Sequence, residues 1–541
     1  MEVRGKSLLS RDLEAPIARA TLAAGGAADS KDTPRNPDLS LRLGVVLAAT
    51  VFLCGVAVRA GLAYASRGYL SHDDLLSIFE GQASQSQMLD FDTMPPLHAS
   101  ILFAWSKLFG IGVLQARLLS VVFSVLALAV ICRMANYLFN RRVALLALLL
   151  LSVSQASIFF GQMIRAYAIF QFLALLSSYL FIRALREKRL PLWTAFVISS
   201  IFMEYTHYYG VFVIAALVVC AFIYRKRYPI PRSWIVGGAA VALVSYLPWL
   251  VELRPGGPTD LRRYYAETSG LASYFVVHWT TFFKTLDEFN NGVSFRWWTL
   301  AAGGLLLSLP AALAMGRAFS RDASDEGTQR RNAEGATILA VLWLFPFLVL
   351  LGLGVLGVPF TLRYVLFCAA PYYILVAFGI STLKIAPLRL SLIALIVAYS
   401  GYSIADTFSQ RSDSAHVVMA HIHANLRTGD CGSIVWIMTA PPSWLALWDT
   451  PAPGPPLAPI PIARADRLSA RIIPRSSLPA EVTSCSRLWI IKAGEEDFGP
   501  IPEQMKRLDQ EEMQMLGPSH SMVDEFVDHE LAVDLYARNG D

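Results

Sequence analysis

The sequence predicts a polytopic α-helical membrane protein with a small C-terminal α/β domain. Of its 541 residues, 55% are hydrophobic and only 16% are charged, and the mean hydropathy is +0.47. Soluble proteins carry about 25% charged residues, so this chain has too little charge to cover a water-facing surface. The composition excludes a disordered chain, a disulfide-rich mini-protein and an ordinary cytosolic enzyme. The net charge of +5 is modest for so long a chain, so we relate it to membrane orientation rather than to nucleic acid binding.

Apolar runs long enough to cross a bilayer recur along residues 43–405. A spanning helix needs roughly 20 mostly apolar residues, and on that basis we predict about eleven spans. The first apolar run begins near Leu43, too late for the apolar core of a cleavable signal peptide, so we expect it to stay as a signal anchor. The predicted spans are 43–65, 118–138, 143–161, 166–186, 191–206, 208–224, 233–252, 297–316, 335–357, 361–382 and 388–405.

Basic residues gather in alternate loops between these spans. Because basic loops stay in the cytoplasm, the polar N-terminal tail, residues 1–42, is predicted to be cytoplasmic. An odd number of spans then places residues 406–541 outside the cytoplasmic (inner or plasma) membrane. The basic loops lie at 141–142, 186–189, 225–232, 317–331 and 384–389.

Residues 406–541 are predicted to form a small extracytoplasmic α/β domain. Two β-like runs, 434–438 and 488–491, each begin three residues after a cysteine, Cys431 and Cys485. If these strands lie side by side and parallel, the equal offsets bring the thiols together, and a disulfide there requires an oxidising compartment. Two unpaired cysteines fit the sequence equally well. The remaining predictions for this domain are a proline-rich loop at 451–461 and a helix at 503–515.

Ionisable side chains gather at the predicted outer ends of the spans, although their segments are far apart in the sequence. Charged groups inside a bilayer are costly, so a collection of them on one side indicates function. The first outer loop, 66–117, carries Asp73 and Asp74 at the start of a predicted amphipathic surface helix. The remaining residues are Arg165, Tyr167 and His207 in short outer turns, Arg262 and Arg263 in the long outer loop 253–296, and Arg363 with Tyr364 at the start of a span.

Each of these residues also has a structural interpretation when it is considered alone. Asp73 fits the N-cap of the surface helix as well as it fits a catalytic role. His207, among tyrosines, is typical of an interfacial aromatic belt, and Arg165 and Arg363 are typical of arginines that reach lipid headgroups. The segment Asp90-Phe91-Asp92 resembles a metal-binding pattern but is more typical of a solvated turn. The shared side of the membrane is what favours a functional site.

The order of these segments resembles the GT-C membrane glycosyltransferases, in the group of the protein O-mannosyltransferases and the lipid A aminoarabinose and galacturonic acid transferases. The resemblance covers about 43–405, which is then a GT-C-like transmembrane domain, and it is strongest over 69–210. The matching segments, in order, are Asp73-Asp74, 95–105, Gln115-Ala116-Arg117, Arg165-Ala166-Tyr167, 205–208 and Arg363-Tyr364.

The resemblance implies transfer of a sugar from a polyprenyl-phosphate donor to an acceptor at the outer face of the membrane. It implies that Asp73 is the catalytic base. Asp74 stands where the family has a glutamate. Because its side chain is shorter, its role in catalysis is left open. A hydroxyl acceptor needs a carboxylate to take its proton. With a single base and no carboxylate nucleophile, we expect an inverting displacement.

The arginines at the predicted outer face are suited to binding the phosphate of the donor. A lipid phosphate leaves as an anion and therefore needs cations rather than a general acid, and arginine matches phosphate geometry. The residues expected to bind the donor phosphate and sugar are Arg165, Tyr167, His207, Arg262, Arg263, Arg363 and Tyr364.

The main alternative is a polytopic transporter or flippase for lipids or glycans. That class commonly places polar or broken helices near the bilayer midplane and often shows internal repeats. The spans here are mostly uncharged in their middles, with Arg59 as the main exception. Further alternatives are a glycan polymerase or ligase and a non-catalytic assembly subunit.

The expected partners follow from the glycosyltransferase interpretation. They are a polyprenyl-phosphate-linked sugar, membrane lipids and a lipid, glycan or protein acceptor, with no nucleic acid among them. No nucleotide-binding glycine loop is found, and the reaction requires no cofactor. A divalent metal near Asp73, Asp74 and His207 stays open.

Overall fold

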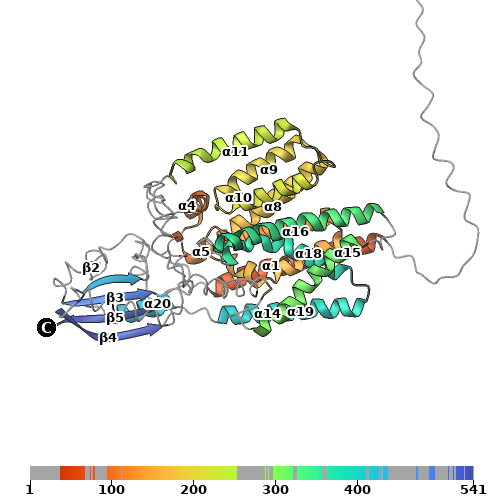
Figure 1. The fold of residues 1–541 in the computed structure, drawn as a ribbon. Coiled ribbons are helices and arrows are strands. Elements are labelled where there is room, and N and C mark those ends of the chain that lie inside the picture. The colour runs from red at the N-terminus through yellow and green to blue at the C-terminus, as the bar shows by residue number, and fades with distance from the viewer. Residues whose placement is uncertain are drawn as a thin grey trace, which may run out of the picture. The chain divides into compact units, whose positions relative to one another are not determined.

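The computed structural model contains a bundle of helices and a C-terminal sheet (Figure 1). The chain divides into the compact units Met1–Val46 and Leu47–Asp541, and the described part of the first unit is the start of its helix α1. The structure describes residues 37–66, 74, 77–78, 94–110, 112–252, 287, 290–291, 297–320, 326–355, 362–409, 414–425, 427, 430–436, 471–472, 486–493, 510, 516, 519–528 and 531–539.

Every predicted span coincides with a helix or with consecutive helices. Among the described residues, six helices are long and apolar enough to cross a membrane, and three shorter apolar helices accompany them. A multi-pass membrane protein is therefore confirmed, whereas the count of about eleven spans stays a prediction. The helices are α1 (Pro37–Ala65), α4 (Leu97–Phe109), α5 (Val113–Leu138), α6 (Arg141–Ser152), α7 (Gln155–Phe160), α8 (Tyr167–Glu187), α9 (Leu190–Glu204), α10 (Gly210–Ile223), α11 (Arg232–Glu252), α14 (Trp297–Gly303), the π-helix η1 (Gly304–Ser308), α15 (Leu309–Phe319), α16 (Glu326–Val355), α17 (Leu362–Val365), the 3-10 helix η2 (Leu366–Cys368), α18 (Ala369–Ser381) and α19 (Ala386–Ser409).

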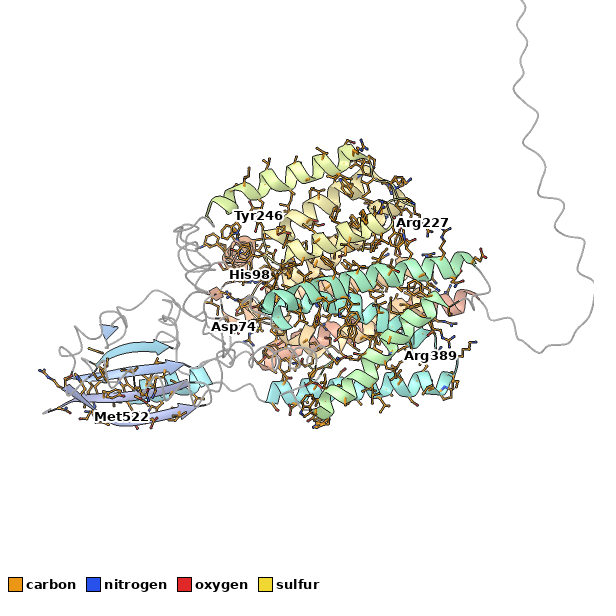
Figure 2. The ribbon with its side chains drawn as sticks, viewed as in Figure 1. Asp74, His98, Arg227, Tyr246, Arg389 and Met522 are labelled. Carbon is orange, nitrogen blue, oxygen red and sulfur yellow. The ribbon has the colours of Figure 1, made fainter. Side chains whose placement is uncertain are left out.

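The two ends of the bundle carry different side chains, as Figure 2 shows. Asp74, His98 and Tyr246 lie at one end, and Arg227 and Arg389 lie at the other. The basic loops used to predict the orientation contain Arg227 and Arg389. The end with Asp74 is therefore the one predicted to face away from the cytoplasm.

The predicted span 143–161 is broken into α6 and α7, and the buried Arg59 of α1 stabilises the break. Its guanidinium donates to the carbonyl oxygens of Leu151 and Ser152, at 2.9 and 3.1 Å. These carbonyls belong to the last turn of α6, where no further helical turn supplies donors; the backbone N–H of Ser154 also donates to the carbonyl oxygen of Leu151, at 3.4 Å. The Nε of Arg59 also donates to Ser124 Oγ of α5 at 2.8 Å. One charged side chain thus joins α1, α5 and the end of α6.

A second buried anchor comes from the end of the predicted outer loop 253–296. The Oδ1 of Asn290 accepts from the hydroxyl of Tyr372 at 2.6 Å. The Oδ1 of Asn291 accepts from the backbone N–H of Gln155 at 3.2 Å, and its amide nitrogen donates to Ser400 Oγ at 3.0 Å. Asn291 has a left-handed backbone, φ 62°, which asparagine tolerates better than most residues. This segment therefore connects α7, α18 and α19.

The C-terminal part is a five-stranded mixed sheet in the order β2-β1-β3-β5-β4, accompanied by α20 (Ser414–Asn425). The predicted strands at 434–438 and 488–491 correspond to β1 and β3, which are adjacent and parallel, with Cys431 opposite Leu488. Cys431 is disulfide-bonded, and its predicted partner Cys485 lies outside the described residues. The strands are β1 (Cys431–Trp436), β2 (Arg471–Ile472), β3 (Arg487–Ala493), β4 (His520–Asp528) and β5 (Leu531–Arg538).

The rest of the C-terminal domain differs from the predictions or lies outside the described residues. The antiparallel pair β4–β5 was not predicted. The predicted loop at 451–461 lies outside the described residues. So does the predicted helix at 503–515, apart from residue 510.

Replacing Arg59 by lysine is expected to lower the thermal unfolding midpoint of the protein in detergent micelles. Lysine keeps the charge but loses the planar fork, so buried carbonyl oxygens at the end of α6 lose their donors, at a cost of about 2 kcal/mol. Arg133→Lys is the matched control, because Arg133 of α5 is exposed. Equal midpoints for the two variants would contradict the anchoring role of Arg59.

Asp287, near the buried anchor, is expected to make the stability depend on pH. Burial raises the pKa of its carboxyl to about 6, although the hydroxyl of Thr299 donates to it at 2.8 Å and opposes the shift. Because this folded-state pKa exceeds the unfolded value of 3.8, folding takes up a proton between the two values. The stabilisation is complete below the unfolded pKa and is lost as the pH rises to about 6.

Asp287→Asn should therefore flatten the fall of the unfolding midpoint between about pH 4 and about pH 6. The measurement is a series of thermal unfolding curves of both proteins across this range. An unchanged slope in the variant would show that Asp287 is not the titrating group.

Candidate functional site

The carboxylate of Asp74 is buried at the end of the bundle in an ion pair. Its Oδ2 lies 3.2 Å from Nη2 of Arg117 in α5, and both side chains are 1% exposed. Its Oδ1 accepts from the backbone N–H of Ile164 at 2.7 Å. Asp74 thus ties the acidic outer loop to α5 and to the turn 161–166 between α7 and α8.

Arg117 extends this anchor to the end of α1. Its Nη1 donates to the carbonyl oxygen of Ser66 at 2.5 Å and lies 3.2 Å from the Ser66 hydroxyl. On the next turn of α5, the hydroxyl of Ser120 donates to the carbonyl oxygen of Met163 at 2.6 Å. The turn 161–166 is therefore held by contacts with both the acidic outer loop and α5.

Glycine is required at the start of this turn. A Cβ on Gly161 would lie 2.4 Å from the carbonyl oxygen of Ser157 and 2.6 Å from Ser124 Oγ. Both distances are far below van der Waals contact, and one of them is to backbone that cannot give way. The close approach of the turn to α5 and α7 thus depends on the missing side chain.

Arg165 follows Ile164 directly and lies at the same place. Its side chain is buried, and its Nη1 is 3.5 Å from the hydroxyl of Ser77. Ser77 and Ile78 belong to the predicted surface helix, and Ile78 packs against Ile164 and Leu102 of α4. The described part of the acidic outer loop therefore contacts the Arg165 turn through hydrogen bonds and apolar packing.

His207 lies in the turn between α9 and α10 and faces α8. Its buried ring stacks on Phe170, with centroids 5.0 Å apart, and lies 6.4 Å from the ring of Tyr167. Its Nδ1 accepts from the backbone N–H of Tyr209 at 3.2 Å. Phe170 in turn meets Phe367 of η2 at 5.1 Å. One phenylalanine thus brings together the histidine turn and the segment that follows Arg363.

Arg363 lies in α17, immediately before η2, and is half-buried. The side-chain amide of Gln171 donates to the carbonyl oxygen of Leu366 at 3.3 Å, so α8 holds this segment directly. Tyr364 belongs to the same short helix. The predicted site residues Asp73, Arg262 and Arg263 lie outside the described residues.

The structure therefore brings Asp74, Arg165, Tyr167, His207 and the Arg363 segment to one end of the bundle. Sequence reasoning did not assign a site role to Arg117. The available signals were its position at the start of an apolar span and its place in the family-like segment Gln115-Ala116-Arg117, whereas its partner Asp74 lies 43 residues away. Among the described residues, no group of three His, Cys, Asp or Glu side chains could hold a metal ion.

Comparisons with known proteins support the resemblance found in the sequence. Residues 93–251 match the family described as dolichyl-phosphate-mannose-protein mannosyltransferase. The structure of ArnT from Cupriavidus metallidurans bound to undecaprenyl phosphate is similar over 92% of this chain and 98% of that chain, with 14% identity and a TM-score of 0.55. The oligosaccharyltransferase of Archaeoglobus fulgidus in its apo form is similar over 92% and 74%, with 11% identity and a TM-score of 0.52.

No curated protein sequence matches this chain. The structural similarities, at 14% and 11% identity, concern the fold. The resemblance to the GT-C membrane glycosyltransferases is confirmed at that level, and residues 93–251 carry the sequence match.

Asp74→Asn is expected to destabilise the protein, because it leaves the buried charge of Arg117 without a counter-charge. Removing one partner of a buried ion pair costs about 3–5 kcal/mol. Combining it with Arg117→Met should cost less than the sum of the single changes, as judged from unfolding midpoints in detergent. The control, Glu187→Gln, breaks a part-exposed pair with Arg183 and should change little. Additive effects of the two site substitutions would argue against the pair.

Proposed function

We propose that the chain is an integral-membrane glycosyltransferase. It moves a sugar from a polyprenyl-phosphate donor to an envelope acceptor at the outer face of the cytoplasmic membrane. The observation that carries the proposal is the attachment of the acidic outer loop to the turn with Arg165, through Asp74 and the amide of Ile164. This contact places an acidic loop beside a cation, as a transfer between a hydroxyl and a phosphate ester requires. The match of residues 93–251 and the fold shared with ArnT support the same class of reaction.

Asp73 is the general base in this proposal. A hydroxyl is a weak nucleophile until a carboxylate within hydrogen-bond reach takes its proton. Both oxygens of the neighbouring Asp74 already have partners, which supports a positioning role for Asp74 rather than a catalytic one. Asp74 then fixes the start of the surface helix, and Asp73 is the carboxylate left to act on the acceptor.

The donor phosphate is bound by arginines in this proposal. The acceptor oxygen attacks the anomeric carbon, the bond from that carbon to the phosphate oxygen breaks, and the acceptor proton goes to Asp73. The polyprenyl phosphate leaves with the electron pair as an anion, so cations stabilise the developing charge without a general acid. A single displacement of this kind inverts the anomeric centre and needs no cofactor. The proposed phosphate ligands are Arg165, Arg262, Arg263 and Arg363, and Tyr167, His207 and Tyr364 are proposed to surround the sugar.

The location of the site suits an amphipathic donor. Drawing a polyprenyl tail into water costs about 0.8 kcal/mol for each exposed CH₂ group. A site at the end of the helical bundle lets the tail stay in lipid while the sugar meets a water-borne or membrane-bound acceptor.

Asp73→Asn is expected to abolish sugar transfer and to leave folding and donor binding largely intact. Loss of a general base slows a reaction by about 10² to 10⁴-fold. Mass spectrometry of envelope lipids and glycans, from cells with and without the gene, would first identify the missing glycosyl unit. The rate is then measured with the purified full-length protein and the corresponding polyprenyl-phosphate sugar.

Asp90→Asn is the matched control, because it makes the same change in the same outer loop at a residue predicted to lie in a solvated turn. It should keep its activity. Full activity of Asp73→Asn would exclude Asp73 as the base.

A further inference from the structure

The turn between α9 and α10 has a second face, opposite the one that carries His207. Whereas His207 contacts α8, Tyr205 and Tyr208 contact α11. The rings of Tyr205 and Tyr246 meet edge to face at 5.4 Å, and those of Tyr208 and Trp249 stack at 6.5 Å. The hydroxyl of Tyr205 also donates to the carbonyl oxygen of Ser245. This second face is an aromatic cluster at the same end of the bundle as Asp74 (Figure 2).

The aromatic cluster lies beside a carboxyl group, that of Glu204. Glu204 is the last residue of α9, and within the described part of the chain its buried Oε1 has no hydrogen-bond donor. No described lysine or arginine forms an ion pair with it. Charged groups within apolar helices are rare and normally paired, so an unpaired one indicates a ligand or a transported proton.

The carboxyl group of Glu204 lies at the start of α10. A Cβ on Gly210 would lie 3.0 Å from Glu204 Oε1, so this oxygen lies against the first residue of that helix. Glu204 is also close enough to Tyr246 to interact with it electrostatically. The carboxylate is therefore available as a hydrogen-bond acceptor beside aromatic rings.

Trp249 supplies a second polar group without a partner. Its side chain is 3% exposed, and its Nε1 donates to no group among the described residues. Trp249 and Tyr246 are three residues apart on α11 and so lie on one face of that helix. Burying an N–H donor without a partner costs about 1–3 kcal/mol. A site that keeps both an unpaired acceptor and an unpaired donor is suited to a ligand that offers hydroxyl groups.

A pyranose ring has this chemistry. Its hydroxyl groups both donate and accept hydrogen bonds, and its C–H faces pack on the electron-rich faces of aromatic rings. Ligand sites typically combine aromatic walls with a few placed polar groups. The site also sets a preference. Among the described residues no cation pairs with Glu204, so the charge of an acidic sugar would be buried without a counter-ion, which is costly, whereas a neutral or amino sugar avoids this cost.

We propose that Glu204, Tyr246 and Trp249 form a subsite for a non-acidic pyranose of the acceptor. The assignment to the acceptor rests on the proposed glycosyltransferase function. His207 directs the other face of the same turn towards Tyr167, in the direction of the proposed donor site. The backbone N–H of Leu97, at the start of α4, donates to the carbonyl oxygen of Tyr205 at 2.9 Å, which ties the turn to the loop of the proposed base. The subsite thus lies beside the donor site and is attached to the same loop.

The test is sugar binding by the purified full-length protein, measured by saturation-transfer difference NMR. The probes are the methyl glycosides of glucose, glucosamine and glucuronic acid. We expect the first two to bind and the glucuronide to bind at least about tenfold more weakly, because its carboxylate would be buried without a cation. Binding of the glucuronide as tightly as the glucoside would overturn the subsite.

Three variants separate a ligand role from a packing role. Glu204→Gln and Trp249→Phe each keep the shape of the side chain and remove one polar function, so both should weaken glucoside binding about tenfold. Glu204→Gln should unfold at the same temperature as the parent or higher, because it replaces a buried ionisable group by a neutral one of similar shape. Tyr246→Ala should also lose binding. Unchanged binding in all three variants would overturn the proposal.

Two further variants distinguish a failure of the subsite from a failure of the proposed glycosyltransferase function. Glu187→Gln makes the same change in the last residue of α8, where the carboxylate pairs with Arg183, and should bind the glucoside like the parent. Asp73→Asn should bind the glucoside normally while it fails to transfer sugar. One possible result is that glucoside binding depends on Glu204 while sugar transfer does not depend on Asp73. This result would support the subsite and contradict the proposed mechanism. The reverse result would remove the subsite alone.

Discussion

The buried ion pair between Asp74 and Arg117 is the constraint on which the arrangement of the site depends. Taking two charges out of water is expensive, and the cost is recovered only when each charge also has further hydrogen-bond partners. Asp74 finds one in the amide of Ile164, and Arg117 finds one in the carbonyl oxygen of Ser66. Each of these contacts joins a different segment, so moving any segment would leave a charge uncompensated. The acidic loop, the Arg165 turn and the end of α1 are therefore fixed together.

The same rule explains the irregular backbone elsewhere in the bundle. A break such as that between α6 and α7 frees backbone groups, which cannot be solvated by lipid. Arg59 supplies donors for the carbonyls at the end of α6, and Asn291 receives the amide of Gln155 at the start of α7. Because protein groups satisfy both sides of the break, α7 can lead into the turn 161–166. Arg59 and Asn291 thus help to position the turn 161–166 through α6 and α7, which precede it.

The elements with a strong local pattern were predictable from the sequence, and those that depend on distant contacts were not. Long apolar runs and alternating basic loops indicated the spans, and two β-like runs indicated strands β1 and β3. These strands are parallel, but Cys431 lies opposite Leu488 rather than opposite Cys485 as equal offsets would require. The β4–β5 hairpin was missed because β4 is a polar edge strand whose alternation is interrupted between Met522 and Asp524. The sequence placed Asp74 in the acidic pair, but its contact with Arg117 depends on tertiary packing. The sequence alone therefore could not assign Asp74 to an ion pair.

The short turn between α9 and α10 directs side chains towards two different helices. Consecutive residues of a tight turn point in different directions, so His207 reaches α8 while Tyr205 and Tyr208 reach α11. A transferase must hold donor and acceptor within bonding distance, and a fixed turn between two sites keeps their separation constant. The hydrogen bond from Leu97 to Tyr205 then relates both faces to the acidic loop. In the proposed reaction, this one backbone segment would relate the residues proposed to bind the donor, the proposed acceptor subsite and the acidic loop.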